Sequence, residues 1–117
     1  MIGGGISAAQ VAVALARRRS GPVALVMRHA PRVHQFDSDV CWIGEQCLRH
    51  FRRTHDMRHR RDIIRRARHR GSMPPDVHRQ LIKDLGRGAL CLLEAVVERA
   101  TPDPLGRGVL LHCPGRA

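Results

Sequence analysis

The sequence predicts an α/β domain with a small parallel sheet, flanking helices and a C-terminal β-hairpin. Three observations lead to this fold class: an alanine-rich apolar run after a glycine-rich turn, a short apolar run typical of a buried strand, and a series of amphipathic stretches. Strand and helix signals that alternate along a chain are typical of α/β architectures. We therefore expect the 117 residues to form one domain.

Residues 1–30 predict a strand–turn–helix–strand unit. Residues 6–16 are almost continuously apolar or small, and their alanines favour a helix. The three arginines at 17–19 suit the negative C-terminal end of that helix, and residues 20–22 end it with turn chemistry. The unbroken apolar run at 23–27 predicts a strand that is buried on both faces, as in parallel sheets.

After an irregular loop at 31–41, residues 43–86 predict a helical segment. Apolar side chains recur there at helical spacing in three stripes. The stripes are Ile43, Cys47, Leu48 and Phe51, then Ile63, Ile64 and Ala67, then Val77, Leu81, Ile82 and Leu85. We expect Gly71 to end the second helix at its C′ position, and Pro74 and Pro75 to occupy the first turn of the third.

Residues 89–113 predict a β-hairpin. The run at 89–99 is compatible with helix or strand, and its valine pair and the flanking glycines favour a strand. Residues 101–108 have the proline, aspartate and glycine content of a turn. The short apolar run at 109–113 then supplies the second strand.

The glycine-rich turn has the pattern of a dinucleotide-binding fingerprint, G-x-G-x-x-A, over residues 3–8. In such a fold Gly3 permits the tight turn, Gly5 lets the backbone approach a pyrophosphate, and Ala8 allows close packing of helix and sheet. The free N–H groups of the first helical turn, with the Ser7 hydroxyl beside Ile6, then hold phosphates. The motif therefore predicts a Rossmann-like dinucleotide-binding domain. The alternative is that residues 3–8 form an ordinary glycine turn with no ligand.

A cation stands where the second strand of this unit ends. Arg28 follows Gly3 by 25 residues, and His29 comes next. Proteins that bind NAD carry an acid at this point for the ribose hydroxyls, whereas a guanidinium suits the 2′-phosphate of NADP. Arg28 and His29 therefore join Gly3, Gly5, Ile6, Ser7 and Ala8 as the candidate cofactor-binding residues. The alternative is a solvated arginine in an arginine-rich chain.

With these motifs the chain resembles the NADPH-binding domain of FAD/NAD(P)-binding oxidoreductases. These are two-dinucleotide flavoproteins, similar in layout to lysine and ornithine N-hydroxylases and to pyridine nucleotide reductases. The resemblance extends from residue 1 to about residue 85 and rests on the stretches IGGGISAAQ, VMRH, QFDSDVCWIG and ARHRGSMPPDV. It implies NADPH as the cofactor of this chain and leaves a monooxygenase and a reductase open as the parent. The absence of spaced redox cysteines favours the monooxygenase-like parent.

The chain departs from the pattern of these flavoproteins in three ways. It has no second glycine-rich fingerprint for FAD, no closing A-T-G turn, and only two residues before Gly3 where a strand of four or more is usual. The resemblance therefore implies a piece of a flavoprotein, truncated at both ends and not catalytic alone. FAD and the substrate site would belong to the missing half.

Charge supports a second interpretation. The formal net charge is +11, and residues 49–70 hold ten arginines, four histidines and two aspartates, which is +8 in one stretch. Such a stretch suits a nucleic-acid-binding module. It contains no aromatic residue except Phe51 and matches no helix-turn-helix or zinc-finger pattern, so a solvated basic helix is the simpler interpretation. A remnant of a flavoprotein without function is the third alternative.

Cysteine spacing and hydropathy predict where such a chain is located. The four cysteines form no C-x-x-C pair and have no histidines at zinc-finger spacing, so we expect no metal site and free or buried thiols in a reducing cytoplasm. No apolar run reaches membrane-spanning length, and no charged leader precedes a cleavage site.

Overall fold

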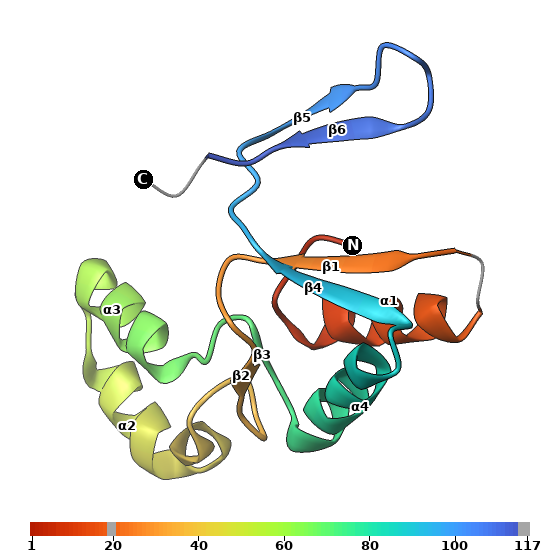
Figure 1. Ribbon diagram of the computed structural model, residues 1–117. Helices are drawn as coiled ribbons and strands as arrows, with labels where there is room; N and C mark the ends of the chain where they lie inside the picture. Colours follow the sequence, from red (N-terminus) through yellow and green to blue (C-terminus); the bar gives the residue numbers. More distant parts are fainter. Residues whose placement is uncertain (19–20, 115–117) are drawn as a thin grey trace.

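The computed structural model describes residues 1–18 and 21–114, which form a mixed α/β fold (Figure 1). The helices within these residues are α1 (Ile6–Arg17), α2 (Glu45–Arg53), α3 (Met57–Ala67) and α4 (Pro75–Gly86), with a 3-10 turn, η1, at Val40–Ile43. The strands are β1 (Val23–Met27), β2 (Arg32–Val33), β3 (Ser72–Met73), β4 (Leu90–Glu94), β5 (Arg99–Pro102) and β6 (Val109–His112). They pair as β1 with β4, β2 with β3, and β5 with β6.

The sheet that carries the core is parallel and centres on β1. β4 pairs with one edge of β1, with Val23 opposite Leu90. On the other edge the chain before Gly3 adds a short parallel segment, because the Gly3 N–H donates to the Val26 carbonyl at 2.9 Å and the Val26 N–H donates to the Met1 carbonyl at 2.8 Å. β1 therefore has a parallel neighbour on each side.

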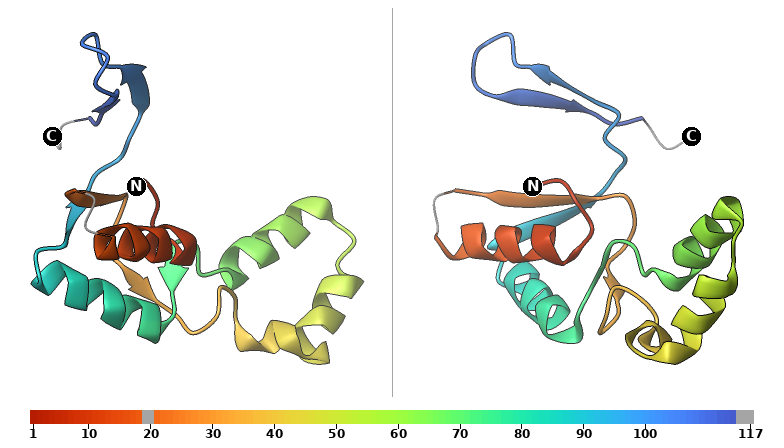
Figure 2. Two further views of the ribbon diagram at one scale, coloured as in Figure 1. Left: turned by 90° about the vertical axis from the view of Figure 1, so that its right-hand side faces the viewer. Right: turned by 180° about the vertical axis from the view of Figure 1, so that it is seen from behind.

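The core lies between this sheet and two helices. α1 and α4 pack against each other and against the same side of β1 and β4, as Figures 1 and 2 show. The inner side of α1 is formed by small residues, which explains its close packing on the strand. The core cluster consists of Ala8, Ala9, Ala12, Val13 and Ala16 of α1 with Leu25, Met27, Met73, Leu81 and Leu90.

Two further units project from this core. The basic lobe, residues 37–69, contains η1, α2 and α3 and leaves the core between β2 and β3, which pair in parallel. The C-terminal hairpin pairs β5 with β6 in antiparallel register, and the Thr101 hydroxyl lies 2.7 Å from the ring nitrogen Nε2 of His112. Figure 1 shows the lobe beside the sheet and the hairpin above it.

Most of the predicted elements are confirmed. α1 and β1 lie where residues 6–16 and 23–27 predict them, and the three apolar stripes correspond to α2, α3 and α4 except at Ile43, which is exposed at the end of η1. Pro75 is the first residue of α4, with Pro74 at its N-cap, which fits the fixed φ of proline. Arg19 and Ser20, which we expect at the end of α1, lie outside the described residues.

The prediction of one hairpin over 89–113 is wrong for its first strand. Residues 90–94 form β4, which is paired with β1, and the hairpin extends only over 99–112. The burial of Leu90 in the core explains the difference, because a neighbour in the parallel sheet buries more apolar area than an exposed hairpin does. Two residues of the expected loop at 31–41 also form β2.

Gly71 does not end α3. The C-cap of that helix is Arg68, in extended conformation, and Gly71 adopts a φ of +66° three residues later, just before β3. Gly71 therefore has the left-handed conformation that favours glycine, but this conformation directs the chain into β3 and does not end a helix.

The interpretation of all four cysteines as thiols is wrong for two of them. Cys41 and Cys47 form a disulfide that links η1 to α2, whereas Cys91 and Cys113 are free and exposed. A spacing of six residues is no recognised pairing signal, which is why the sequence alone does not reveal it. None of the helices within residues 1–18 and 21–114 has the length and apolarity needed to span a lipid bilayer.

The disulfide predicts the thiol content of the purified chain. Without reductant, a chromogenic thiol reagent should titrate two thiols per chain, those of Cys91 and Cys113, because both are exposed. After reduction under denaturing conditions the same reagent should titrate all four cysteines. Four reactive thiols in the unreduced chain would contradict the Cys41–Cys47 bond.

Candidate functional site

The glycine-rich turn brings the start of α1 into close contact with the sheet. Gly3 has a φ of +147°, and a Cβ placed on it would lie 2.9 Å from the Cβ of Ala8. Ala8 is itself buried in the core. Because no side chain fits at Gly3 and little more than a methyl group fits at Ala8, this part of the pattern meets the steric demands expected of it.

The N-terminus of α1 begins directly after this turn. Gly5 is its N-cap, and within the described residues no side chain caps the helix. The first N–H groups of an α-helix lack intrahelical acceptors, so this end presents donors and a partial positive charge. Ser7 is exposed on the first turn beside the half-exposed Ile6, and its hydroxyl is accessible to a ligand at this end.

The carboxyl end of β1 places Arg28 and His29 beside the turn. Arg28 is exposed, and the His29 ring is half-buried between Gly4 and Gly71. A Cβ on Gly71 would lie 2.9 Å from Nε2 of His29, and a Cβ on Gly4 would lie 3.4 Å from its Cε1. Glycine at both positions therefore makes room for this ring.

Two adjoining cavities open at this point. One, of about 150 Å³, is lined by Ile2, Gly3, Gly4, Val26, Arg28, His29, Gly71, Ala95 and Val97. The other, of about 360 Å³, is lined by Arg28, His29, Arg32, Arg70 and Gly71. Since both share Arg28, His29 and Gly71, they form one crevice with an apolar inner part and a cationic mouth.

The cationic mouth joins arginines that are far apart in the sequence. Arg32 opposes Ser72 in the β2–β3 pair, which places it next to Arg70, and its Nη1 donates to the Arg70 carbonyl at 3.4 Å. No carboxylate lies within 4.0 Å of Arg28, Arg32 or Arg70 in the part of the chain that the structure describes. Such a group of guanidinium side chains suits an anion such as a phosphate.

The structure gathers the predicted site residues to different degrees. Gly3, Arg28 and His29 line the crevice, and Ala8 lies buried beneath Gly3. Gly5, Ile6 and Ser7 adjoin it at the start of α1 but are not part of its lining. The sequence reasoning missed Arg32, Arg70 and Gly71. Only the pairing of β2 with β3, across the whole basic lobe, brings these three to the site.

A larger cavity lies at the opposite end of the sheet. It measures about 580 Å³ and is lined by residues near the ends of α1 and α4, among them Arg17, Asp84 and Arg87. Asp84 is buried; its Oδ1 accepts from Gln80 at 3.2 Å, and its Oδ2 has no partner in the described part of the chain. None of the predicted site residues lines this cavity.

No protein-family model, curated protein or solved structure matches this chain.

The close approach at Gly3 predicts the outcome of a substitution. Gly3→Ala should lower the free energy of unfolding by about 1–3 kcal/mol, because it combines an unfavourable φ with a clash against Ala8. Gly86→Ala is the matched control, since its Cβ would meet nothing within 4 Å and alanine favours a helix by roughly 0.5–1 kcal/mol. Urea denaturation followed by circular dichroism measures both changes. Equal stability of the two variants would show that Gly3 and Ala8 do not approach closely.

Proposed function

We propose that the chain is a Rossmann-like NADPH-binding unit of a flavin-dependent oxidoreductase, and that its crevice at the carboxyl end of β1 holds the nucleotide. The observation that carries this proposal is the position of Arg28, Arg32 and Arg70 around the crevice that begins at Gly3. Nucleotides bind outside the carboxyl ends of parallel strands in folds of this type.

The chemistry of the crevice fits the parts of the ligand. The donors at the start of α1 suit the pyrophosphate. The three arginines suit the extra 2′-phosphate that distinguishes NADPH from NADH. Val26, Ala95 and Val97 provide apolar walls for the flat face of a base. The cavity at the mouth, about 360 Å³, falls within the usual range of ligand sites.

The redox part of the proposal rests on the resemblance to FAD/NAD(P)-binding oxidoreductases. In these proteins hydride passes from NADPH to a flavin that a separate fingerprint holds, and this chain has one fingerprint. We therefore assign to this chain the binding and positioning of NADPH, and to a flavin-binding partner domain the oxidation itself.

Nucleotide preference tests the role of the arginines. In calorimetric titrations, NADP⁺ should bind at least about tenfold more tightly than NAD⁺, a difference of about 1.4 kcal/mol, because only NADP⁺ carries the 2′-phosphate. Arg28→Ala should remove most of this preference. Arg87→Ala, which changes an exposed arginine at the opposite end of the sheet, should leave it unchanged.

A folded sample that binds neither nucleotide would contradict the proposal. It would also be contradicted if the Arg28→Ala variant kept the wild-type preference for NADP⁺ over NAD⁺. Circular dichroism of each variant verifies that it is folded.

The assignment of the chemistry to a partner domain has its own test. Mixed with FAD and NADPH, the purified chain should not speed the loss of NADPH absorbance above the rate without protein. Flavin retained by the chain together with faster NADPH consumption would show that it is an oxidoreductase by itself.

A further inference from the structure

The two ends of the basic lobe, near residues 37–39 and 67–69, are joined to each other. The Asp39 N–H donates to the Ala67 carbonyl at 3.0 Å, and the His69 N–H donates to the Asp37 carbonyl at 2.8 Å. The His69 ring also contacts the Asp39 carboxylate at 3.2 Å and stacks on His34 at 3.8 Å between ring centroids. These contacts hold together the chain segments that enter and leave the lobe. α2 and α3 extend from there away from the sheet (Figures 1 and 2).

The two large aromatic side chains of the lobe contact each other. Trp42 contacts Phe51 edge to face, with 5.4 Å between ring centroids, and the Arg60 guanidinium lies 4.2 Å from the centroid of Phe51. The Cys41–Cys47 disulfide holds Trp42 next to the start of α2. Both rings are half-buried and engaged in these contacts, so they offer little free face on which bases could stack.

The outer faces of both helices carry arginine. Arg49, Arg52 and Arg53 share one side of α2, and Arg58, Arg61 and Arg65 recur on one side of α3 at spacings of three and four residues. All six are exposed. Each helix therefore carries a row of cations along one exposed side.

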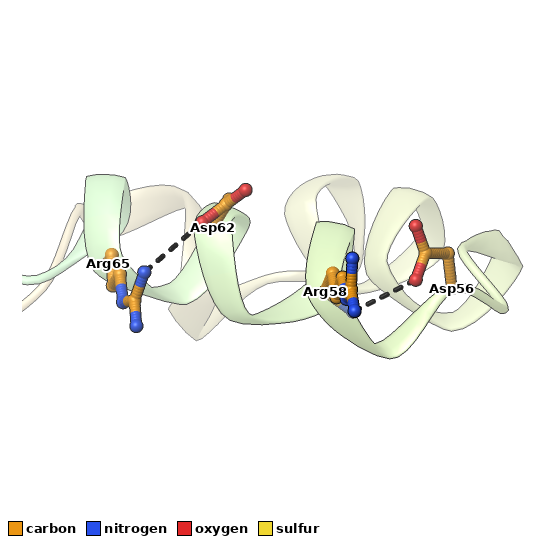
Figure 3. Close-up of polar contacts among 4 residues, drawn as sticks. All are labelled: Asp56, Arg58, Asp62 and Arg65. Carbon is orange, nitrogen blue, oxygen red and sulfur yellow. Dashed lines mark hydrogen bonds and ion pairs between the residues drawn. The ribbon is translucent and has the colours of Figure 1, made fainter.

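Most of these guanidinium groups are not neutralised. Arg52, Arg65 and Arg68 each have a carboxylate within 4.0 Å. Figure 3 shows Arg65 paired with Asp62, whereas Asp56 accepts the backbone N–H of Arg58 and leaves the Arg58 side chain available. Within residues 1–18 and 21–114 the arginines of the lobe without a carboxylate partner are Arg49, Arg53, Arg58, Arg60, Arg61 and Arg66.

We propose that the rows of exposed arginines on α2 and α3 are docking sites for the phosphate backbone of a nucleic-acid duplex. Exposed guanidinium groups without carboxylate partners bind phosphate oxygens and release counterions from the duplex. A duplex is favoured over a single strand because Trp42 and Phe51 contact each other and Arg60, and the lobe holds no other tryptophan, tyrosine or phenylalanine on which unpaired bases could stack. The surface is distinct from the nucleotide crevice, so this proposal does not depend on NADPH binding.

The observations also favour a duplex over an anionic membrane. A helix that lies in a lipid interface presents an apolar face to the acyl chains. α2 exposes no large apolar side chain, and its arginines share the exposed surface with Glu45. α3 exposes only Met57 and Ile64, which do not make the wide apolar face that an interfacial helix buries.

Fluorescence anisotropy with the full chain tests the proposal. The probes are a labelled DNA duplex of mixed sequence, about 20 base pairs long, and an RNA duplex of the same sequence, each titrated at several salt concentrations. We expect at least one duplex to bind with an affinity that falls steeply with salt. The triple variant Arg53→Gln, Arg58→Gln, Arg61→Gln should bind at least about tenfold more weakly and reduce the salt slope by about 2 to 3, since each phosphate contact contributes about 0.9.

The matched control is the triple variant Arg79→Gln, Arg87→Gln, Arg99→Gln, which removes the same charge from exposed positions outside the lobe. Its retained affinity would show that binding is local to α2 and α3. An equal loss in both triple variants would overturn the proposal, because net charge alone would then explain binding. Binding of neither duplex would overturn it too, as would tighter binding to phosphatidylserine vesicles than to either duplex.

Discussion

The small side chains on the inner side of α1 set the distance between this helix and β1. Ala8, Ala9 and Ala12 are buried against a strand that has a parallel neighbour on both edges. A longer side chain at Ala8 would meet the chain at Gly3, where even an added Cβ would come within 2.9 Å. This close packing fixes the turn before α1, and it places the donor end of the helix beside the residues that follow β1. The crevice and its cations depend on that contact.

Local sequence predicts the parts of this arrangement that depend on periodicity and steric limits. The helices follow from their apolar stripes, and the glycine turn follows from a pattern whose geometry requires small residues at Gly3 and Ala8. Local sequence does not predict which strand an apolar run pairs with. Residues 90–94 have the composition of a strand, but only the burial of Leu90 beside α4 shows why they join β1 and not the hairpin.

Part of the candidate site likewise depends on long-range strand pairing, which the local sequence does not predict. Arg32 and Arg70 are 38 residues apart and meet because β2 pairs with β3. Nothing in the local sequence around either arginine indicates this contact, and Arg70 belongs, by composition alone, to the basic run at 49–70. The Cys41–Cys47 bond is hidden for the same reason, since a pairing depends on the path of the chain and not on a motif.

The excess positive charge of the chain is divided between two surfaces of different shape. Around His29 the arginines line a concave crevice with apolar walls, which suits a small phosphorylated ligand. On α2 and α3 they cover an exposed helical surface, which suits an extended polyanion. Backbone amide chemical shifts of the isotopically labelled chain, titrated with NADP⁺, distinguish these two surfaces. We expect the amide shifts of residues 3–8, 28–32 and 70–71 to change and those on the outer face of α3 to stay the same. Changes confined to α2 and α3, or none at all in the folded chain, would contradict this expectation.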